Sequence, residues 1–157
     1  MTVRHALVLA ALALLVVALA LKLVGGRTST GAIVADPART PGVLNADVTQ
    51  ASIRSTICTH GWTATIRPPV DYTNALKRTQ MRAYGETGPA SAYQEDHLIS
   101  LELGGDPTDP RNLWPEPYPR AAEVDRIENE LNAAVCSGRL SLRGAQEQES
   151  ELKHAHG

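Results

Sequence analysis

The sequence predicts an α+β fold: a small hairpin of extended segments with helices before and after it, preceded by an N-terminal transmembrane or signal helix. Three observations lead to this prediction. Residues 6–21 form an uninterrupted run of uncharged, apolar side chains. Residues 121–135 carry apolar side chains on one stripe at helical spacing. Residues 93–100 have the pattern of a strand and precede a loop rich in glycine, aspartate and proline.

The composition allows one domain after the apolar run. The chain has 157 residues, of which 43% are hydrophobic, enough for one ordinary core. Phenylalanine is absent, so that core must be built mainly from leucine, isoleucine, valine and alanine. The expected parts are a signal peptide or membrane anchor, a flexible linker, the domain and a disordered tail, at residues 1–27, 28–42, 43–149 and 150–157.

The N-terminal apolar run has two interpretations. Its sixteen residues exceed the ~7–15 of a typical signal peptide and fall short of the ~20 that span a bilayer comfortably. A cleaved signal peptide and an uncleaved anchor both fit, and the anchor would make the membrane a partner. Arg4 precedes the run, and positive charge there favours an N-terminus inside the cytoplasm. Both interpretations therefore predict an extracytoplasmic domain, membrane-anchored or secreted.

Cys58 and Cys136 are the only cysteines. Outside the cytoplasm such a pair most simply forms a disulfide, and closing a loop of this length contributes ~3–4.5 kcal/mol. Two buried free thiols are the alternative. A zinc site fits less well, because His60 is the only potential partner ligand close to either cysteine in sequence. His60 itself is interpreted as a surface turn residue.

The charge balance excludes one class of nucleic-acid binder. After Arg27 the chain carries twelve basic and seventeen acidic residues, a formal net charge of −5 with neutral histidines. Proteins that hold nucleic acid by bulk charge are basic, so any contact with DNA or RNA must use a local patch. Lys77, Arg78 and Arg82 are interpreted as a solvated helix face, with a phosphate-contacting patch as the alternative.

The remaining elements follow from periodicity and turn residues. We expect helices over residues 47–55, 73–84, 121–135 and 141–149, and extended segments over residues 58–66, 93–100 and 112–114. Gly85 and Gly138 stand where helices are expected to end. Pro115, Pro117 and Pro119 are expected to prevent a helix or a strand ladder for several residues.

A family resemblance rests on two short motifs. The run EDHLISLELGG at residues 95–105 is followed by NLW at residues 112–114. This Asp-His, Gly-Gly and Asn-Leu pattern resembles that of HNH (ββα-metal) endonucleases, and more closely a group of small exported bacterial proteins with an HNH-like domain. The similarity covers residues 43–148 for that group and 96–131 for the wider family. It implies a small ββα-metal core with additional N- and C-terminal helices, and metal-dependent hydrolysis of nucleic acid phosphodiesters.

The residue types in these motifs suit that chemistry. Cleaving a phosphodiester needs a base for the attacking water and a cation to offset the charge that builds on the phosphate. His97 titrates near neutrality and is the candidate base. Asp96 offers a hard oxygen ligand for Mg²⁺, with Mn²⁺ or Ca²⁺ as alternatives. The resemblance implies that Asn112 hydrogen-bonds across the hairpin, holding the loop or orienting His97.

The sequence departs from the family pattern at its third position. HNH enzymes usually carry a histidine or asparagine ligand on the following helix, but no histidine lies between His97 and His154. Residues 120–124 occupy that position, and Glu123 is the only one of them with ligand chemistry, so we expect it to be the second metal ligand beside Asp96. His154 and His156 are assigned to a mobile tail, with weak metal binding as the alternative.

Two functions from different classes remain open. The first is a membrane-tethered or secreted nuclease whose partner is nucleic acid. The second is a catalytically inactive extracytoplasmic module that keeps the scaffold and binds a protein or envelope component; the missing histidine and the negative charge favour it. A buried Asp-His pair with Asn112 closing the hairpin would serve this structural role. Trp114 is interpreted as a packed corner rather than a base-stacking platform. The sequence names no immunity protein or other protein partner.

Overall fold

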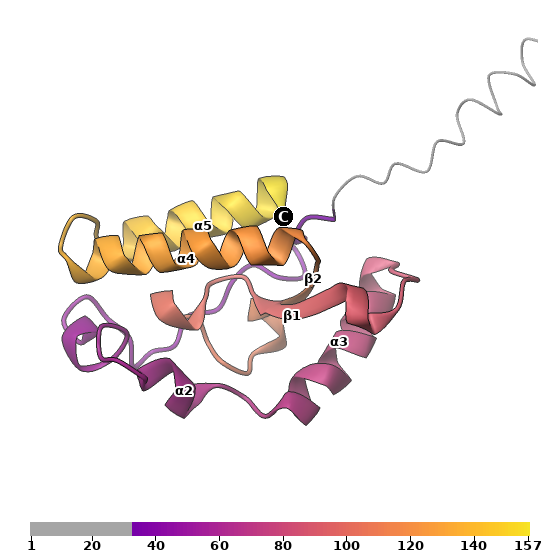
Figure 1. Cartoon of the computed structure of the whole chain (residues 1–157), viewed down its shortest axis with the longest axis horizontal. Helices are drawn as coiled ribbons and strands as arrows, with labels where there is room; N and C mark the ends of the chain where they lie inside the picture. The colour runs from indigo at the N-terminus through magenta and orange to yellow at the C-terminus, as the bar shows by residue number, and fades with distance from the viewer. Residues whose placement is uncertain (1–32) are drawn as a thin grey trace, which may run out of the picture. The chain divides into compact units, whose positions relative to one another are not determined.

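The computed structural model describes residues 33–157 (Figure 1). The predicted signal peptide or anchor and the first part of the predicted linker lie outside the described residues. Within residues 33–157, no helix combines the length and the apolar character needed to cross a membrane.

The described part of the chain is α+β, as predicted, with four helices and one two-stranded sheet. In Figure 1, α4 (Arg120–Cys136) and α5 (Leu142–His156) run side by side on one side of the sheet. The helices α2 (Trp62–Ile66) and α3 (Val70–Tyr84) lie on the other side, with β1 (Tyr93–His97) and β2 (Leu113–Pro117) between them. Short 3-10 turns complete the fold at Ile53–Ser55, Ala90–Ala92, Leu101–Leu103 and Pro110–Asn112.

The two strands pair antiparallel and continue through the prolines of β2. The expectation that Pro115 and Pro117 would prevent a ladder was wrong. These prolines are two residues apart, so their nitrogens point to the same edge of the strand. The N–H of the next residue, Tyr118, donates to Ala92 O across the hairpin at 2.9 Å. The proline nitrogens therefore face away from β1 and remove no bond from the ladder.

Two predicted helices are confirmed with small shifts at their ends. α3 begins at Val70, three residues before the predicted start, directly after Pro69. It ends at Tyr84, and Gly85 caps it with a φ of 76°, the left-handed conformation that glycine adopts without strain. α4 begins three residues after β2 ends, so the chain order is strand, strand, helix.

Two predictions in the N-terminal half were wrong. Residues 58–66 were expected to be extended, but Trp62–Ile66 forms α2. Residues 47–55 were expected to be a helix, but only the 3-10 turn Ile53–Ser55 forms. The apolar and polar side chains of Trp62–Ile66 do alternate, but no strand lies beside them to accept a ladder in the described structure, and one helical turn satisfies the backbone locally.

The C-terminal residues belong to the fold and are not the disordered tail that we expected. α5 does not end near residue 149 but continues to His156. Lys153 is completely buried, its carbonyl accepts from Ala35 N at 3.1 Å, and His154 Nε2 lies 2.9 Å from Thr40 O. Since Ala35 and Thr40 are also buried, residues 33–42 pack on the domain and are not a flexible linker.

The core consists of two clusters. The larger one brings α4 and α5 onto the hairpin loop and the N-terminal turns, with the buried members Val48, Ile53, Ile57, Ile99, Leu103, Val135, Leu142 and Ala145. The smaller one joins Ala35, Leu98 and Trp114, and the ring of Tyr84 packs 6.3 Å from that of Trp114. Trp114 is completely buried, which confirms the predicted packed corner.

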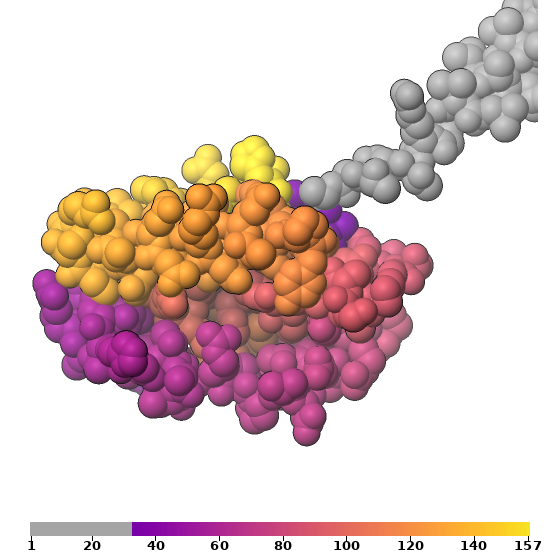
Figure 2. Space-filling view, viewed as in Figure 1, coloured from indigo at the N-terminus to yellow at the C-terminus, as the bar shows by residue number. Residues whose placement is uncertain are grey.

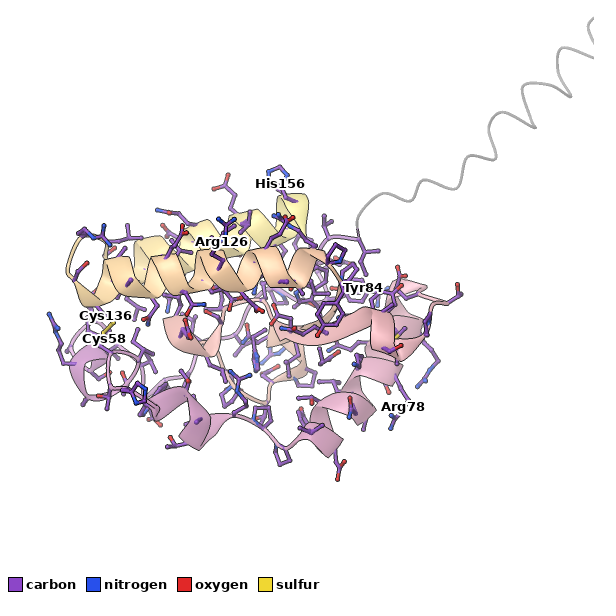
Figure 3. The ribbon with its side chains drawn as sticks, in the orientation of Figure 1. Cys58, Arg78, Tyr84, Arg126, Cys136 and His156 are labelled. Atoms are coloured by element: carbon purple, nitrogen blue, oxygen red, sulfur yellow. A yellow bond between two sulfur atoms is a disulfide. The ribbon has the colours of Figure 1, made fainter. Side chains whose placement is uncertain are left out.

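Cys58 and Cys136 form a disulfide, as predicted. The bond ties the last residue of α4 to the segment before α2 (Figure 3). Cys58 also packs against the larger core cluster. The disulfide therefore fixes one end of α4 relative to the N-terminal half of the domain.

Candidate active site

Asn112 holds the hairpin loop together. Its Nδ2 donates to Ile99 O at 3.0 Å and to Asp106 O at 2.9 Å, and its Oδ1 accepts from Ile99 N at 3.0 Å. The side chain is completely buried, so each of these bonds replaces one that water would otherwise make. The bonds join the end of β1 to the middle of the loop, in agreement with the first of the two roles that the resemblance implies for Asn112, which is to hold the loop.

The Gly104-Gly105 pair allows this loop to close tightly. A Cβ at Gly105 would lie 1.8 Å from Ile99 O and 2.6 Å from Asn112 Nδ2, so no side chain fits there. Gly104 has a φ of 78° and ends the turn Leu101–Leu103. The motif therefore serves close backbone approach around Asn112.

His97 stands at the end of β1 with its two ring nitrogens in different surroundings. Nε2 lies 3.1 Å from Pro107 O, and a carbonyl oxygen can only accept, so Nε2 carries the proton and Nδ1 the lone pair. Nδ1 has no hydrogen-bond partner among residues 33–157, and it is not one of the fully buried polar atoms that lack a partner. Burial lowers the pKa of His97, against a smaller opposing effect of the Pro107 carbonyl. The ring is therefore a neutral base.

Asp96 is paired with a lysine from the C-terminal helix. Lys153 Nζ lies 2.8 Å from Asp96 Oδ2 and 2.6 Å from Glu128 Oε1, and it also donates to His97 O. The Lys153 side chain is fully buried. Burial alone would raise the pKa of Asp96, but the adjacent ammonium holds it at about 2. Asp96 is thus a carboxylate whose counter-ion belongs to the same chain.

Three further carboxyl groups surround the same ammonium. Glu149 Oε1 lies 3.3 Å from Lys153 Nζ, and both Glu149 oxygens accept from Ser100 N at 3.0 Å. Burial and the nearby charge of Asp96 raise the pKa of Glu116 to about 9, and neither of its carboxyl oxygens accepts a hydrogen bond from the described residues. Burial also raises the pKa of Glu128 well above its ordinary value. A single lysine can be surrounded by four buried carboxyls because some of them remain protonated.

Glu123 does not join this cluster. It lies in the first turn of α4 with its side chain 61% exposed, and its Oε2 pairs with Arg120 Nη1 at 2.8 Å. The expectation that Asp96 and Glu123 would share a metal ion is therefore not met. The α4 residues that line the pocket beside the hairpin are instead Asp125, Glu128 and Asn129, which follow Glu123 on the same helix.

A polar pocket of about 330 Å³ opens beside His97. Its walls come from β1, the turn Leu101–Leu103, α4 and the segment after α2, with the lining residues Arg67, Gln94, Asp96, His97, Ser100, Leu101, Glu102, Asp125, Glu128 and Asn129. Figure 2 shows this face, with a hollow between α4 and the α2 and α3 layer. A larger groove of about 620 Å³ beside α5 has one histidine, His154, whose two ring nitrogens face Thr40 O and Ser150 Oγ. A third pocket, of about 320 Å³, is lined by His60 but by no arginine or lysine.

Arg67 is the single cationic side chain that lines this pocket in the described structure. Its side chain is exposed and makes no ion pair or hydrogen bond with residues 33–157, and its backbone N–H donates to Thr63 O. Its positive charge lies close enough to lower the pKa values of both His97 and Glu102. An unpaired guanidinium beside a neutral imidazole can receive an anionic group.

The donor set does not fit the metal ion that the resemblance implies. Asp96 Oδ2 is taken by Lys153, and Glu123 faces solvent with Arg120. Among residues 33–157, no three His, Cys, Asp or Glu side chains are grouped so as to hold a metal ion. The chemistry that this arrangement offers by itself is a neutral base and one free cation at a common pocket.

No protein-family model, curated protein or solved structure matches this chain. The geometry of the pocket therefore carries the functional argument. Sequence reasoning found His97, Asp96 and Asn112 but missed Arg67 and Lys153. The sequence did contain a sign that Lys153 is buried. Residues 142, 145, 149 and 153 lie on one face of a helix, and the first two of them are apolar. Arg67 follows a segment whose secondary structure we predicted wrongly, and nothing in the sequence places it beside the hairpin.

Proposed function

We propose that this protein is a nuclease-like hydrolase that breaks nucleic acid phosphodiesters outside the cytoplasm, with His97 as its base. The observation that carries the proposal is the fixed ring of His97, whose Nε2 faces Pro107 O, at a pocket that both His97 and Arg67 line. The order of hairpin and helix, and the loop held by Asn112, support the HNH-like (ββα-metal) resemblance without establishing it.

Each residue has a separate task in this proposal. His97 Nδ1 takes the proton of the attacking hydroxyl, and the Pro107 carbonyl keeps the ring in the required tautomer. Arg67 offsets the negative charge that builds on the phosphate oxygens. Asn112 touches no substrate but fixes the loop on which Pro107 lies. No step is assigned to a metal ion, because Asp96 and Glu123 are both held by cations of the chain.

The disulfide supports the proposed location. Disulfides persist in oxidising compartments and are rare in the reducing cytosol. The bond between Cys58 and Cys136 therefore agrees with export, whether residues 1–27 act as a cleaved signal peptide or as an anchor.

Digestion of nucleic acid tests the proposal. The full chain, kept in mild detergent because residues 6–21 are apolar, is incubated with plasmid DNA and with RNA, in Mg²⁺, in Mn²⁺ and in EDTA. We expect cleavage by the wild type and a loss of ~10²–10⁴-fold in His97→Ala, the range typical for removing a general base. His60→Ala, an exposed histidine outside the pocket, is the matched control and should cleave at the wild-type rate. Equal inertness of wild type and His97→Ala under all conditions refutes the catalytic role.

One observation favours the second candidate, an inactive HNH-like binding module. Both acidic residues expected to hold a metal are engaged in ion pairs, as in a scaffold that keeps the motif for stability. Absence of hydrolysis, together with a calorimetric titration that detects no binding of Mg²⁺ or Mn²⁺, is the result that this candidate predicts. Divalent binding that Asp96→Ala abolishes would contradict it.

A further inference from the structure

The position beside Asp96 is already occupied by a cation. The Lys153 ammonium contacts Asp96 Oδ2, Glu128 Oε1 and His97 O and lies 3.3 Å from Glu149 Oε1. It is completely buried and is held there by the C-terminal helix. A divalent ion would need the same carboxylate oxygens and would be repelled by the ammonium at contact distance. The positive charge expected from a metal at this position is therefore part of the chain.

The pocket beside His97 presents one base and one free cation to a bound substrate. His97 lines it, and Arg67 supplies the free positive charge. Glu102 and Asp125 also line the pocket, so its walls as a whole are acidic. A phosphate is therefore favoured only close to Arg67, and the pocket has no second free cation in the described structure to activate a water molecule.

DNA and RNA make different demands on such a site. Hydrolysis of DNA needs an external water that is deprotonated and aimed at phosphorus, which is the usual task of divalent ions in nucleases. RNA carries a 2′-hydroxyl next to the phosphate, and well-oriented intramolecular nucleophiles reach effective molarities of ~10⁵–10⁸ M. Cleavage of RNA by its own 2′-hydroxyl therefore needs only a base and a positive charge, which His97 and Arg67 supply.

We propose that this site cleaves RNA through attack of the RNA's own 2′-hydroxyl and needs no divalent ion, because Lys153 holds the place of that ion at Asp96. The proposal rests on the proposed function and names its substrate. His97 Nδ1 takes the 2′-hydroxyl proton, the 2′-oxygen bonds to phosphorus, and the bond from phosphorus to the 5′-oxygen breaks. The leaving 5′-oxygen takes a proton from water, and the imidazolium returns its own proton to the resulting hydroxide. The products are a 2′,3′-cyclic phosphate and a 5′-hydroxyl end.

Two oligonucleotides of the same sequence, one RNA and one DNA, test this proposal with the full chain in EDTA. We expect cleavage of the RNA alone, with cyclic phosphate ends detected by mass spectrometry and a rate that Mg²⁺ does not raise. Arg67→Met should slow cleavage at least tenfold, whereas Arg78→Met should not. Arg78 is the matched control because it is an exposed arginine that points outward from α3 (Figure 3).

The outcomes separate the two proposals. Cleavage of the DNA, a requirement for Mg²⁺, or products with 5′-phosphate ends overturn the RNA inference and leave the phosphodiesterase function standing. No cleavage of either oligonucleotide, with or without metal, overturns both.

Lys153 acts through Asp96 and His97 and is a positioning residue, so its test uses the pH profile of cleavage. The ammonium lowers the pKa of His97, so Lys153→Met should move the acid limb of kcat to higher pH. Lys153→Arg keeps the positive charge and should keep the profile. A folded Lys153→Met with an unchanged acid limb contradicts the role of Lys153. If that variant does not fold, the EDTA experiment on the wild type decides.

Discussion

Lys153 on α5 and Asp96 on β1 are 57 residues apart in the sequence and form a buried ion pair with a Nζ to Oδ2 distance of 2.8 Å. The pair joins the C-terminal helix to the strand that carries His97. Any change in either residue therefore acts on the fold and on the candidate site together.

Removing one member of this pair is expected to be costly. Lys153→Met leaves Asp96 as an unpaired buried charge, and such losses typically cost about 3–5 kcal/mol of unfolding free energy. Asp96→Asn should cost a similar amount, because the ammonium then loses its main counter-ion. Urea denaturation of both single variants and of the double variant measures their coupling. Single variants that each lose less than about 1 kcal/mol would show that the pair does not hold the two elements together.

The hairpin, α3, α4 and the disulfide were predictable because their causes are local. Gly85 ends α3, and the apolar stripe of residues 121–135 marks α4. The cysteine pair needed only the inference of an oxidising compartment. Tertiary context decided the rest. Residues 62–66 form a helix because no strand lies beside them in the described structure. Lys153 is buried because four carboxyl groups lie near its ammonium, one on its own helix and three on β1, β2 and α4. A sequence window shows a lysine near a chain end and cannot show partners 25 to 57 residues away.

The loop held by Asn112 is expected to be the most sensitive part of the hairpin. Asn112→Ala removes three hydrogen bonds and leaves the Ile99 and Asp106 backbone groups without partners, at a cost of about 2–4 kcal/mol. Hydrogen exchange at the Ile99 amide should accelerate more than elsewhere in the domain. Asn74→Ala, on α3 outside the loop, is the control and should cost less than about 1 kcal/mol. Equal losses in the two variants would contradict the role assigned to Asn112.

Reduction of the disulfide is expected to lower the melting temperature. Cys58 and Cys136 are 78 positions apart in the sequence, for which the chain-entropy estimate is about 4.5 kcal/mol. Thermal unfolding with and without reductant measures the effect, and Cys58→Ser with Cys136→Ser should reproduce the reduced curve. A melting temperature that is the same in both conditions would mean that the bond adds nothing to stability.

Glu116 is expected to make the protein less stable at alkaline pH. Its pKa is raised to about 9 in the folded state by burial and by the charge of Asp96, against 4.5 for an ordinary glutamate. The stabilisation is complete below pH 4.5, declines as pH rises, and is lost once pH passes about 9, with a slope of at most about 1.4 kcal/mol per pH unit. Glu116→Gln cannot ionise and keeps the hydrogen-bonding shape of the protonated acid. Urea denaturation between neutral and alkaline pH should show a flatter decline for Glu116→Gln than for the wild type, and parallel declines would contradict the raised pKa.

The protonation state of His97, the proposed base, can be observed directly by ¹⁵N NMR of the histidine rings in the full chain. The account predicts a neutral ring with the proton on Nε2 at neutral pH, and a titration midpoint below the ordinary value of 6.5. His60, which is exposed, provides the reference spectrum in the same sample. A proton on Nδ1, or an imidazolium that persists above neutral pH, would leave the pocket without a base and would contradict the proposed hydrolysis.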